Sequence, residues 1–171
     1  NSCGYKIRKN AQRAKRIEWE HVVPAAVFGR PLECWSHGGR KNCEEKSELF
    51  NKIEGDLHNL RPVVGEVNGD RSDLIYNFVG STFVTYGQCE FKIDFQRDTA
   101  EPPDAIKGDL ARITLFMQEK YNLPFTTEYT NIMKGWAKAD PVSEKEKVIN
   151  TLIKDIQGDS NYYIDGVKNI E

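Results

Sequence analysis

Hydrophobic and polar positions follow two different periods along the chain. Apolar and ring-bearing side chains share one parity between residues 17 and 23, at Ile17, Trp19, His21 and Val23. This alternation predicts a strand over 17–23 that ends at Pro24. A second strand is predicted over 89–95, with Cys89, Phe91, Ile93 and Phe95 on one face. The remaining periodic segments have helical spacing.

Helical spacing is clearest in the second half of the chain. A helix is predicted after Pro102-Pro103 from the positions of Ile106, Leu110, Ile113 and Met117. Another is predicted over about 127–138, with Ile132 and Trp136. A last helix should follow Asp140-Pro141, with a capping box from Ser143 to Glu146 and the apolar residues Ile149, Leu152, Ile153 and Ile156.

The first half predicts a more mixed series. Residues 5–16 are basic and predict a helix, and residues 44–54 predict another, which Gly55 ends. Residues 30–43 are expected to form a loop, 56–62 a short strand, and 65–72 a helix or tight turn. The expected fold is of the α+β class, with a small core in a mainly helical shell. At 171 residues the chain is expected to be a single domain.

Composition and charge change this picture in one respect. Charged residues make up 29 % and hydrophobic residues 39 %, as in a globular protein, and no apolar run approaches a membrane span, so no membrane partner is expected. The net charge of −2 argues against strong binding of nucleic acid. However, six cations precede the first acidic residue: Lys6, Arg8, Lys9, Arg13, Lys15 and Arg16. They form either a local phosphate-binding face or a solvated helix face.

The four cysteines allow two disulfides in three connectivities. Cys34 and Cys43 enclose a short loop with two glycines and are natural partners, which leaves Cys3 with Cys89. Disulfides would indicate an oxidising compartment. The alternative is a zinc site formed by Cys34, His37, Cys43 and His58, which would make the protein a non-catalytic nucleic-acid-binding module.

Candidate chemistry gathers around a carboxylate next to an imidazole. His21 can act as a general base, because an imidazole is partly neutral near pH 7. Glu20 and the amide oxygen of Asn68 suit Mg²⁺, which prefers oxygen ligands. Arg40 follows Gly38-Gly39 and can bind a phosphate with its guanidinium. Taken singly, each residue is more easily explained as a structural or surface residue, so the combination carries the hypothesis of a metal-assisted phosphodiesterase.

Four segments in order resemble the bacterial endonuclease I family. They are residues 18–25 (EWEHVVPA), 34–40 (CWSHGGR), 56–62 (DLHNLRP) and 65–72 (GEVNGDRS). The similarity extends from about Ser2 to beyond residue 121. The family commonly has a cysteine-bearing segment upstream of Cys3, which this sequence lacks, so the partner of Cys3 stays open and a processed or truncated chain is expected.

The resemblance implies a ββα-metal (His-Me finger) core over about 17–72, with a supporting strand and helices over about 83–157. It implies His21 as the general base, Glu20 and Asn68 as ligands of one Mg²⁺ ion, which Mn²⁺ or Ca²⁺ could replace, and Arg40 as the phosphate-binding arginine. It gives Glu54 a supporting acidic role. The implied protein is a monomeric, periplasmic or secreted nuclease whose signal peptide has been removed. It would cleave double- and single-stranded DNA, and RNA as well, without sequence specificity, leaving 5′-phosphate ends. A phosphoesterase of small nucleotides or lipids is a further alternative.

Overall fold

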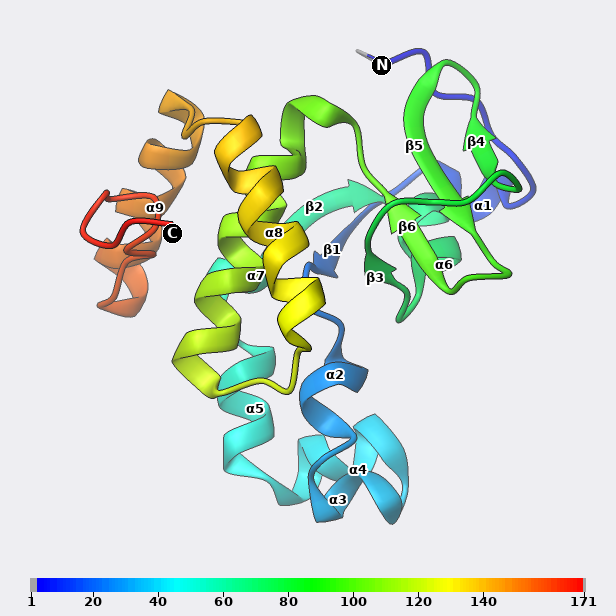
Figure 1. Ribbon diagram of the computed structural model, residues 1–171. Coiled ribbons are helices and arrows are strands. Elements are labelled where there is room, and N and C mark those ends of the chain that lie inside the picture. The colour runs from blue at the N-terminus through cyan, green and yellow to red at the C-terminus, as the bar shows by residue number, and fades with distance from the viewer. Residues whose placement is uncertain (1–2, 171) are drawn as a thin grey trace. The chain divides into compact units, whose positions relative to one another are not determined.

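The structure is a computed structural model that describes residues 3–170 (Figure 1). It contains both helices and strands, which confirms the α+β class. The described chain divides into two compact units. Unit 1 comprises residues 3–20 and 61–104, and unit 2 comprises residues 21–60 and 105–170. None of the helices in this part of the chain is both long and apolar enough to cross a membrane.

Unit 1 is formed largely by strands. Its elements are α1 (Ala11–Ala14), β1 (Ile17–His21), β2 (Leu60–Val64), α6 (Gly65–Arg71), β3 (Ile75–Tyr76), β4 (Val84–Tyr86), β5 (Cys89–Asp94) and β6 (Thr99–Glu101), where β1 and β2 each extend one residue beyond it. β1 pairs with β2, and the other strands form a sheet of order β3-β6-β5-β4. β3 runs parallel to β6, whereas β5 is antiparallel to both of its neighbours (Figure 1).

The helix predicted over residues 5–16 is wrong except for the single turn of α1. Tyr5 forms a bridge with Gly87 at the β4–β5 turn. The backbone N–H groups of Arg8, Lys9 and Asn10 all donate to the carboxylate of Glu66. Those N–H groups are therefore used by a side chain and cannot form a helical ladder. Gly87 has φ 72° and lies so close to the Gly4 carbonyl that a Cβ there would clash.

β5 was predicted correctly, but its apolar face is shorter than expected. Cys89 and Ile93 are buried, while Phe95 lies beyond the strand and is exposed. Two cations lie over its ring, with Arg8 Cζ at 5.6 Å and Lys9 Nζ at 5.8 Å from the centroid. Phe95 therefore packs under long cationic side chains rather than in the core.

Unit 2 is helical. Its elements are α2 (Ala25–Gly29), α3 (Glu33–Ser36), α4 (Gly39–Lys46), α5 (Glu48–Glu54), the 3₁₀ turns η1 (Leu57–Asn59) and η2 (Asp104–Ile106, which begins one residue before the unit), α7 (Lys107–Tyr121), α8 (Thr127–Ala139) and α9 (Glu144–Gln157). α7 packs along α8, and its core residues include Met117 and Phe116 (Figure 1). The three helices predicted from 106 onwards are confirmed, as is the capping box between Ser143 and Glu146.

A buried ion pair that the sequence did not reveal joins α7 to α9. Arg112 donates through Nε and Nη2 to both carboxylate oxygens of Glu146, each at 2.7 Å. Its Nη1 also donates to the backbone carbonyls of Ala137 and Asp140. Because both charges are almost completely buried and the guanidinium is saturated with acceptors, the pair fixes the relative position of three helices.

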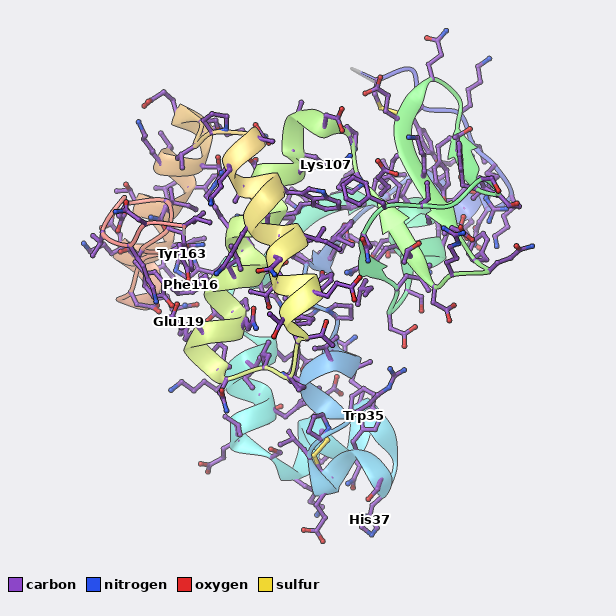
Figure 2. All side chains as sticks on the ribbon, in the orientation of Figure 1. Trp35, His37, Lys107, Phe116, Glu119 and Tyr163 are labelled. Carbon is purple, nitrogen blue, oxygen red and sulfur yellow. A yellow bond between two sulfur atoms is a disulfide. The ribbon has the colours of Figure 1, made fainter. Side chains whose placement is uncertain are left out.

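The loop predicted over residues 30–43 is also wrong, because it contains α3 and part of α4. Gly38 and Gly39 have φ of 141° and 65°, and this break in the chain separates the two short helices. The predicted helix 44–54 is interrupted at Ser47, whose hydroxyl accepts from the N–H of Phe50 and caps α5. Figure 2 shows Trp35 beside the disulfide of this region and His37 pointing away from it.

The strand predicted over 56–62 starts late. The Asp56 carboxylate accepts from the N–H of His58, which closes the turn η1 before β2 begins at Leu60. The strand predicted over 17–23 ends at His21, two residues early, because Val22 already lies in a bend ahead of Pro24. The helix predicted over 65–72 is confirmed as α6.

The structure contains the disulfides Cys3–Cys89 and Cys34–Cys43, which confirms the pairing expected from the sequence. Cys3–Cys89 joins residues 86 apart and ties the N-terminal segment to the start of β5. Cys34–Cys43 joins residues only 9 apart and links α3 to α4. Chain entropy makes a long loop the more stabilising one to close.

We expect the two disulfides to differ in their contribution to stability. Replacing both cysteines of Cys3–Cys89 by serine should lower the free energy of unfolding by about 2 kcal/mol more than the same change at Cys34–Cys43. Urea denaturation of the two double variants, compared with the parent protein, measures this difference. An equal or reversed order of stability would show that loop length does not govern the effect here.

Candidate active site

In unit 2, the structure brings three of the predicted site residues together. His21 Nε2 lies 2.8 Å from the backbone carbonyl oxygen of Glu54, the last residue of α5. A carbonyl oxygen only accepts hydrogen bonds, so Nε2 carries the proton. The lone pair of the neutral ring is then on Nδ1. The fold therefore selects the tautomer in which Nδ1 can accept a proton.

Arg40 is held by the side chain of the same glutamate. Its Nε donates to Glu54 Oε1 at 2.6 Å and to Glu44 Oε1 at 3.1 Å. The Arg40 side chain is still about half exposed. Glu54 thus contacts the imidazole through its backbone and the guanidinium through its carboxylate. This places a proton acceptor and an anion-binding group around one residue.

In unit 1, two acidic residues of β1 contact the helix α6. Glu18 and Glu20 are two apart in the strand and lie on the same face. Asn68 and Arg71 are three apart in α6 and share a face of that helix. Asn68 contacts Glu18, and Arg71 contacts Glu20. The two proposed metal ligands, Glu20 and Asn68, therefore come from elements that pack directly on each other.

Glu20 is a buried and compensated charge. One of its oxygens, Oε1, accepts from the hydroxyl of Tyr76 at 2.6 Å and lies 3.2 Å from Arg71 Nη1. The Arg71 guanidinium also stacks 4.5 Å from the Tyr76 ring centroid. Since both charges are buried, removing either would take a close opposite charge away from the other.

Asn68 is oriented by Glu18, a residue to which sequence reasoning assigned no role. The amide Nδ2 of Asn68 donates to Glu18 Oε2 at 3.0 Å, which turns the amide oxygen away from that carboxylate. Hydrogen bonds from Arg13, then from Arg16 and Asn68, lower the pKa of Glu18 to about 2. Glu18 is therefore a permanently charged acceptor. Its place two residues before Glu20 was the signal that could have identified it.

Glu66 is an anchor rather than a surface charge. It is 1 % exposed and accepts from the Tyr5 hydroxyl at 2.6 Å as well as from the three N-terminal N–H groups. Burial raises the pKa of the Glu66 carboxyl, but these hydrogen bonds outweigh burial and lower it to about 2. The carboxylate thus fixes the N-terminal segment on α6.

The low pKa of Glu66 predicts an acid-sensitive unit 1. The folded value of about 2 lies below the ordinary 4.5. The stabilisation by Glu66 is therefore complete above pH 4.5 and is lost as pH falls towards 2. We expect the free energy of unfolding to decrease over this interval in the parent protein and less steeply in Glu66→Gln. Urea denaturation at several pH values tests this, and parallel pH profiles would contradict it.

The donors in unit 1 suit a hard divalent ion. Glu20 offers a carboxylate oxygen and Asn68 an oriented amide oxygen, which are ligand types that Mg²⁺ accepts together with several waters. Between residues 3 and 170 no group of three or more His, Cys, Asp or Glu side chains is placed to hold a metal. The two proposed donors would leave the remaining coordination positions to water. The ligand set itself stays a prediction.

The zinc alternative is not supported. Cys34 and Cys43 are joined in a disulfide, so neither can be a thiolate ligand. His58 is buried, with Nε2 3.1 Å from the carbonyl oxygen of Asp159 and its ring edge-on to Phe116. His37 is exposed at the end of α3 (Figure 2). These four residues are used for structure or lie at the surface.

Comparisons with known proteins place the chain among nucleases. The family model described as Endonuclease I matches residues 1–168. "Endonuclease-1" of Buchnera aphidicola subsp. Acyrthosiphon pisum (strain APS) is 47 % identical over 163 residues, which is 95 % of this chain and 65 % of that protein.

Two further relatives differ in their named substrates. "Periplasmic deoxyribonuclease" of Aeromonas hydrophila is 44 % identical over 165 residues, covering 96 % of this chain and 69 % of the relative. "Extracellular ribonuclease" of Bacillus amyloliquefaciens is 30 % identical over 129 residues, covering 64 % and 43 % respectively. The chain thus spans about two thirds of the length of the Buchnera relative and of the periplasmic deoxyribonuclease.

Proposed function

The chain belongs to the endonuclease I family, and we propose on this basis that it is a metal-dependent endonuclease that hydrolyses phosphodiester bonds of nucleic acids. The observation that carries the proposal is the hydrogen bond from His21 Nε2 to the Glu54 carbonyl. It prepares the histidine of the family motif as a base with a defined acceptor atom. Glu54 also binds Arg40 through its carboxylate, so one residue contacts both the proposed base and the proposed phosphate-binding group.

In the proposed reaction, His21 Nδ1 accepts a proton from a water molecule. The water oxygen forms a bond to phosphorus as this proton leaves, and the bond between phosphorus and the 3′-oxygen breaks. The leaving 3′-oxygen takes up a proton from solvent, and the phosphate stays on the 5′ end of the other product. The proton on Nε2 remains bonded to the Glu54 carbonyl, so the imidazole keeps its orientation when it becomes positively charged.

Arg40 is proposed to bind the phosphate that is cleaved. Its Nε donates to Glu54 and Glu44, which orients the guanidinium, and the side chain is about half exposed. A guanidinium can donate two parallel hydrogen bonds to a phosphate and offset the charge that develops on it. Glu54 then has a positioning role for both His21 and Arg40.

Glu20 and Asn68 are proposed to hold one Mg²⁺ ion, for which Mn²⁺ or Ca²⁺ could substitute. When bound, such an ion supplies positive charge that stabilises the phosphorane-like transition state and the leaving oxygen. Glu18 maintains the orientation of the Asn68 amide. Glu20 and His21 are consecutive residues, so the chain itself links the first metal ligand to the base. Together with β1, β2 and α6, this order of residues is what the ββα-metal core predicts.

The proposed substrates are DNA, double- or single-stranded, and RNA, bound as their phosphate backbones. Relatives are named both deoxyribonuclease and ribonuclease. The proposed site residues address the phosphate and the water, and such contacts carry no sequence information. The two disulfides and the relatives' names support a periplasmic or secreted protein. We expect it to act as a monomer.

A plasmid-nicking assay tests the proposal. Supercoiled plasmid should be converted to nicked and linear forms with Mg²⁺ and stay intact with excess EDTA. A long random-sequence duplex should then give a smear, and raised salt should slow its digestion. The 5′ ends of the products should be ligatable without phosphorylation. Intact plasmid at every metal concentration, from oxidised and folded protein, would contradict the proposed function.

A further inference from the structure

The solvent-facing side of β1 carries a large apolar surface. Trp19 is 69 % exposed and Ile17 is 65 % exposed, and the alternation of the strand places both on the face opposite Glu18 and Glu20. Among the tryptophans of the chain, Trp136 is buried and Trp35 is half-buried. Trp19 therefore exposes a large aromatic surface to water on a regular strand, where it is available for stacking.

The strand beneath this ring is firmly held. On its other face, Glu18 accepts from Arg13 Nη2 at 2.5 Å and from Arg16 Nε at 2.7 Å, and Glu20 is buried against Tyr76. The backbone of β1 pairs with β2, and the carbonyl of Arg16 accepts from the N–H of Gly65. The indole is therefore presented by a rigid support, which lowers the entropic cost of binding a ligand.

A cation precedes the exposed face in the chain. Lys15 lies two residues before Ile17 and is exposed, whereas Arg16 is bound through its Nε to Glu18 on the opposite face. Single-stranded nucleic-acid sites combine an exposed aromatic ring, on which a base stacks, with cations that bind the flanking phosphates. A purely apolar protein partner would gain nothing from the charge of Lys15.

We propose that Trp19 is a base-stacking residue that binds an unpaired nucleobase of the substrate, while Lys15 binds an adjacent phosphate. The inference rests on the proposed function in that its ligand is the nucleic acid that the enzyme cleaves. Every base has a π-face, so stacking on Trp19 adds affinity without adding sequence specificity. The substrate form that gains most is single-stranded nucleic acid, whose bases are free to stack.

Binding of a short oligo(dT) and of an abasic oligomer of the same length, both in EDTA to prevent cleavage, isolates the base. We expect wild-type protein to bind oligo(dT) more tightly than the abasic oligomer. Trp19→Ala should weaken oligo(dT) binding by about 5- to 150-fold, the range measured for loss of one base–aromatic stack, and leave abasic binding unchanged. Trp19→Phe should keep part of the difference. Ile17→Ala, an equally exposed change on the same face, is the matched control.

Tryptophan fluorescence gives a second readout. Oligo(dT) should quench the emission of the wild-type protein, and Trp19→Phe should abolish this quenching because the other tryptophans are less accessible. Circular dichroism confirms that the variants are folded. Unchanged oligo(dT) affinity in Trp19→Ala, or equal losses for both oligomers, would overturn the inference.

The two proposals fail in different ways. A wild-type enzyme that cleaves plasmid but binds oligo(dT) without help from Trp19 retains the proposed function and loses the stacking residue. A protein that binds oligo(dT) through Trp19 but cleaves no nucleic acid retains the stacking residue and loses the proposed function. Binding of apolar peptides but not of oligo(dT) to this face would overturn the inference in favour of a protein partner.

Discussion

Replacing His21 by alanine should reduce DNA cleavage by about 10²–10⁴-fold and leave DNA binding unchanged. This range is the usual contribution of a general base, because its loss removes activation of water but not the contacts with phosphate. The change should not unfold the protein, since His21 is only partly buried and ends its strand. Cleavage of plasmid with saturating Mg²⁺ gives the rate, and oligonucleotide binding in EDTA gives the affinity.

His37→Ala is the matched control for this variant. His37 is the exposed histidine at the end of α3 and should tolerate the change with full activity (Figure 2). Glu54→Gln gives a second comparison, because the backbone carbonyl that holds His21 survives the substitution while the ion pair with Arg40 does not. It should therefore lose less activity than His21→Ala. A cleavage rate near that of the parent protein in His21→Ala would exclude His21 as the base.

The helices after residue 106 could be predicted from the sequence because each is long enough for its apolar period to repeat. α7, α8 and α9 each show several apolar turns and, for α9, a cap. β3, β4 and β6 have two or three residues each, which is too short for alternation to be visible. They exist because they pair with β5 or with each other, and such pairing is a tertiary effect.

In the N-terminal segment, a tertiary contact prevents a helix that the local sequence predicts. Residues 5–16 have the composition of a helix, yet the Glu66 carboxylate binds the N–H groups of residues 8–10 and holds them in an irregular path. A single buried carboxylate from a segment more than fifty residues away outweighs a local preference of a few tenths of a kcal/mol per residue. No local sequence pattern around residue 8 indicates that Glu66 is its partner.

The candidate site also contains residues that the sequence could identify and contacts that it could not. Glu20, His21, Arg40 and Asn68 have side chains whose chemistry can be recognised in a sequence motif. The hydrogen bond that selects the His21 tautomer comes from a backbone carbonyl, which every residue possesses, so the sequence could not identify it. Glu54 was expected to have a supporting acidic role, whereas its contact with His21 is made by the main chain. Glu18 supports Asn68 from fifty residues away.

The metal ligands can be tested most cleanly at Asn68. Removing Glu20 would take a close carboxylate away from the buried Arg71 guanidinium, so a loss of activity in Glu20→Ala would mix metal binding with stability. Asn68 is only partly buried and donates to Glu18, which retains Arg13 and Arg16 when the amide is removed. Asn68→Ala should therefore change the affinity for metal and not the fold.

We expect Asn68→Ala to raise the Mg²⁺ concentration for half-maximal cleavage by at least about 10-fold, and Glu18→Ala to raise it by roughly 10- to 100-fold, since residues that orient a ligand commonly contribute that much. Calorimetric titration with Mn²⁺ should show the same order of affinities without any substrate present.

Asn131→Ala, which removes an exposed amide on α8, is the matched control and should leave both measurements unchanged. Because Glu18 stays charged far below neutral pH, its effect should be constant between pH 6 and 9, which separates orientation of the amide from titration of the carboxylate. Unchanged metal affinity in Asn68→Ala would remove the amide from the ligand set, and unchanged affinity in Glu18→Ala alone would show that the amide needs no support.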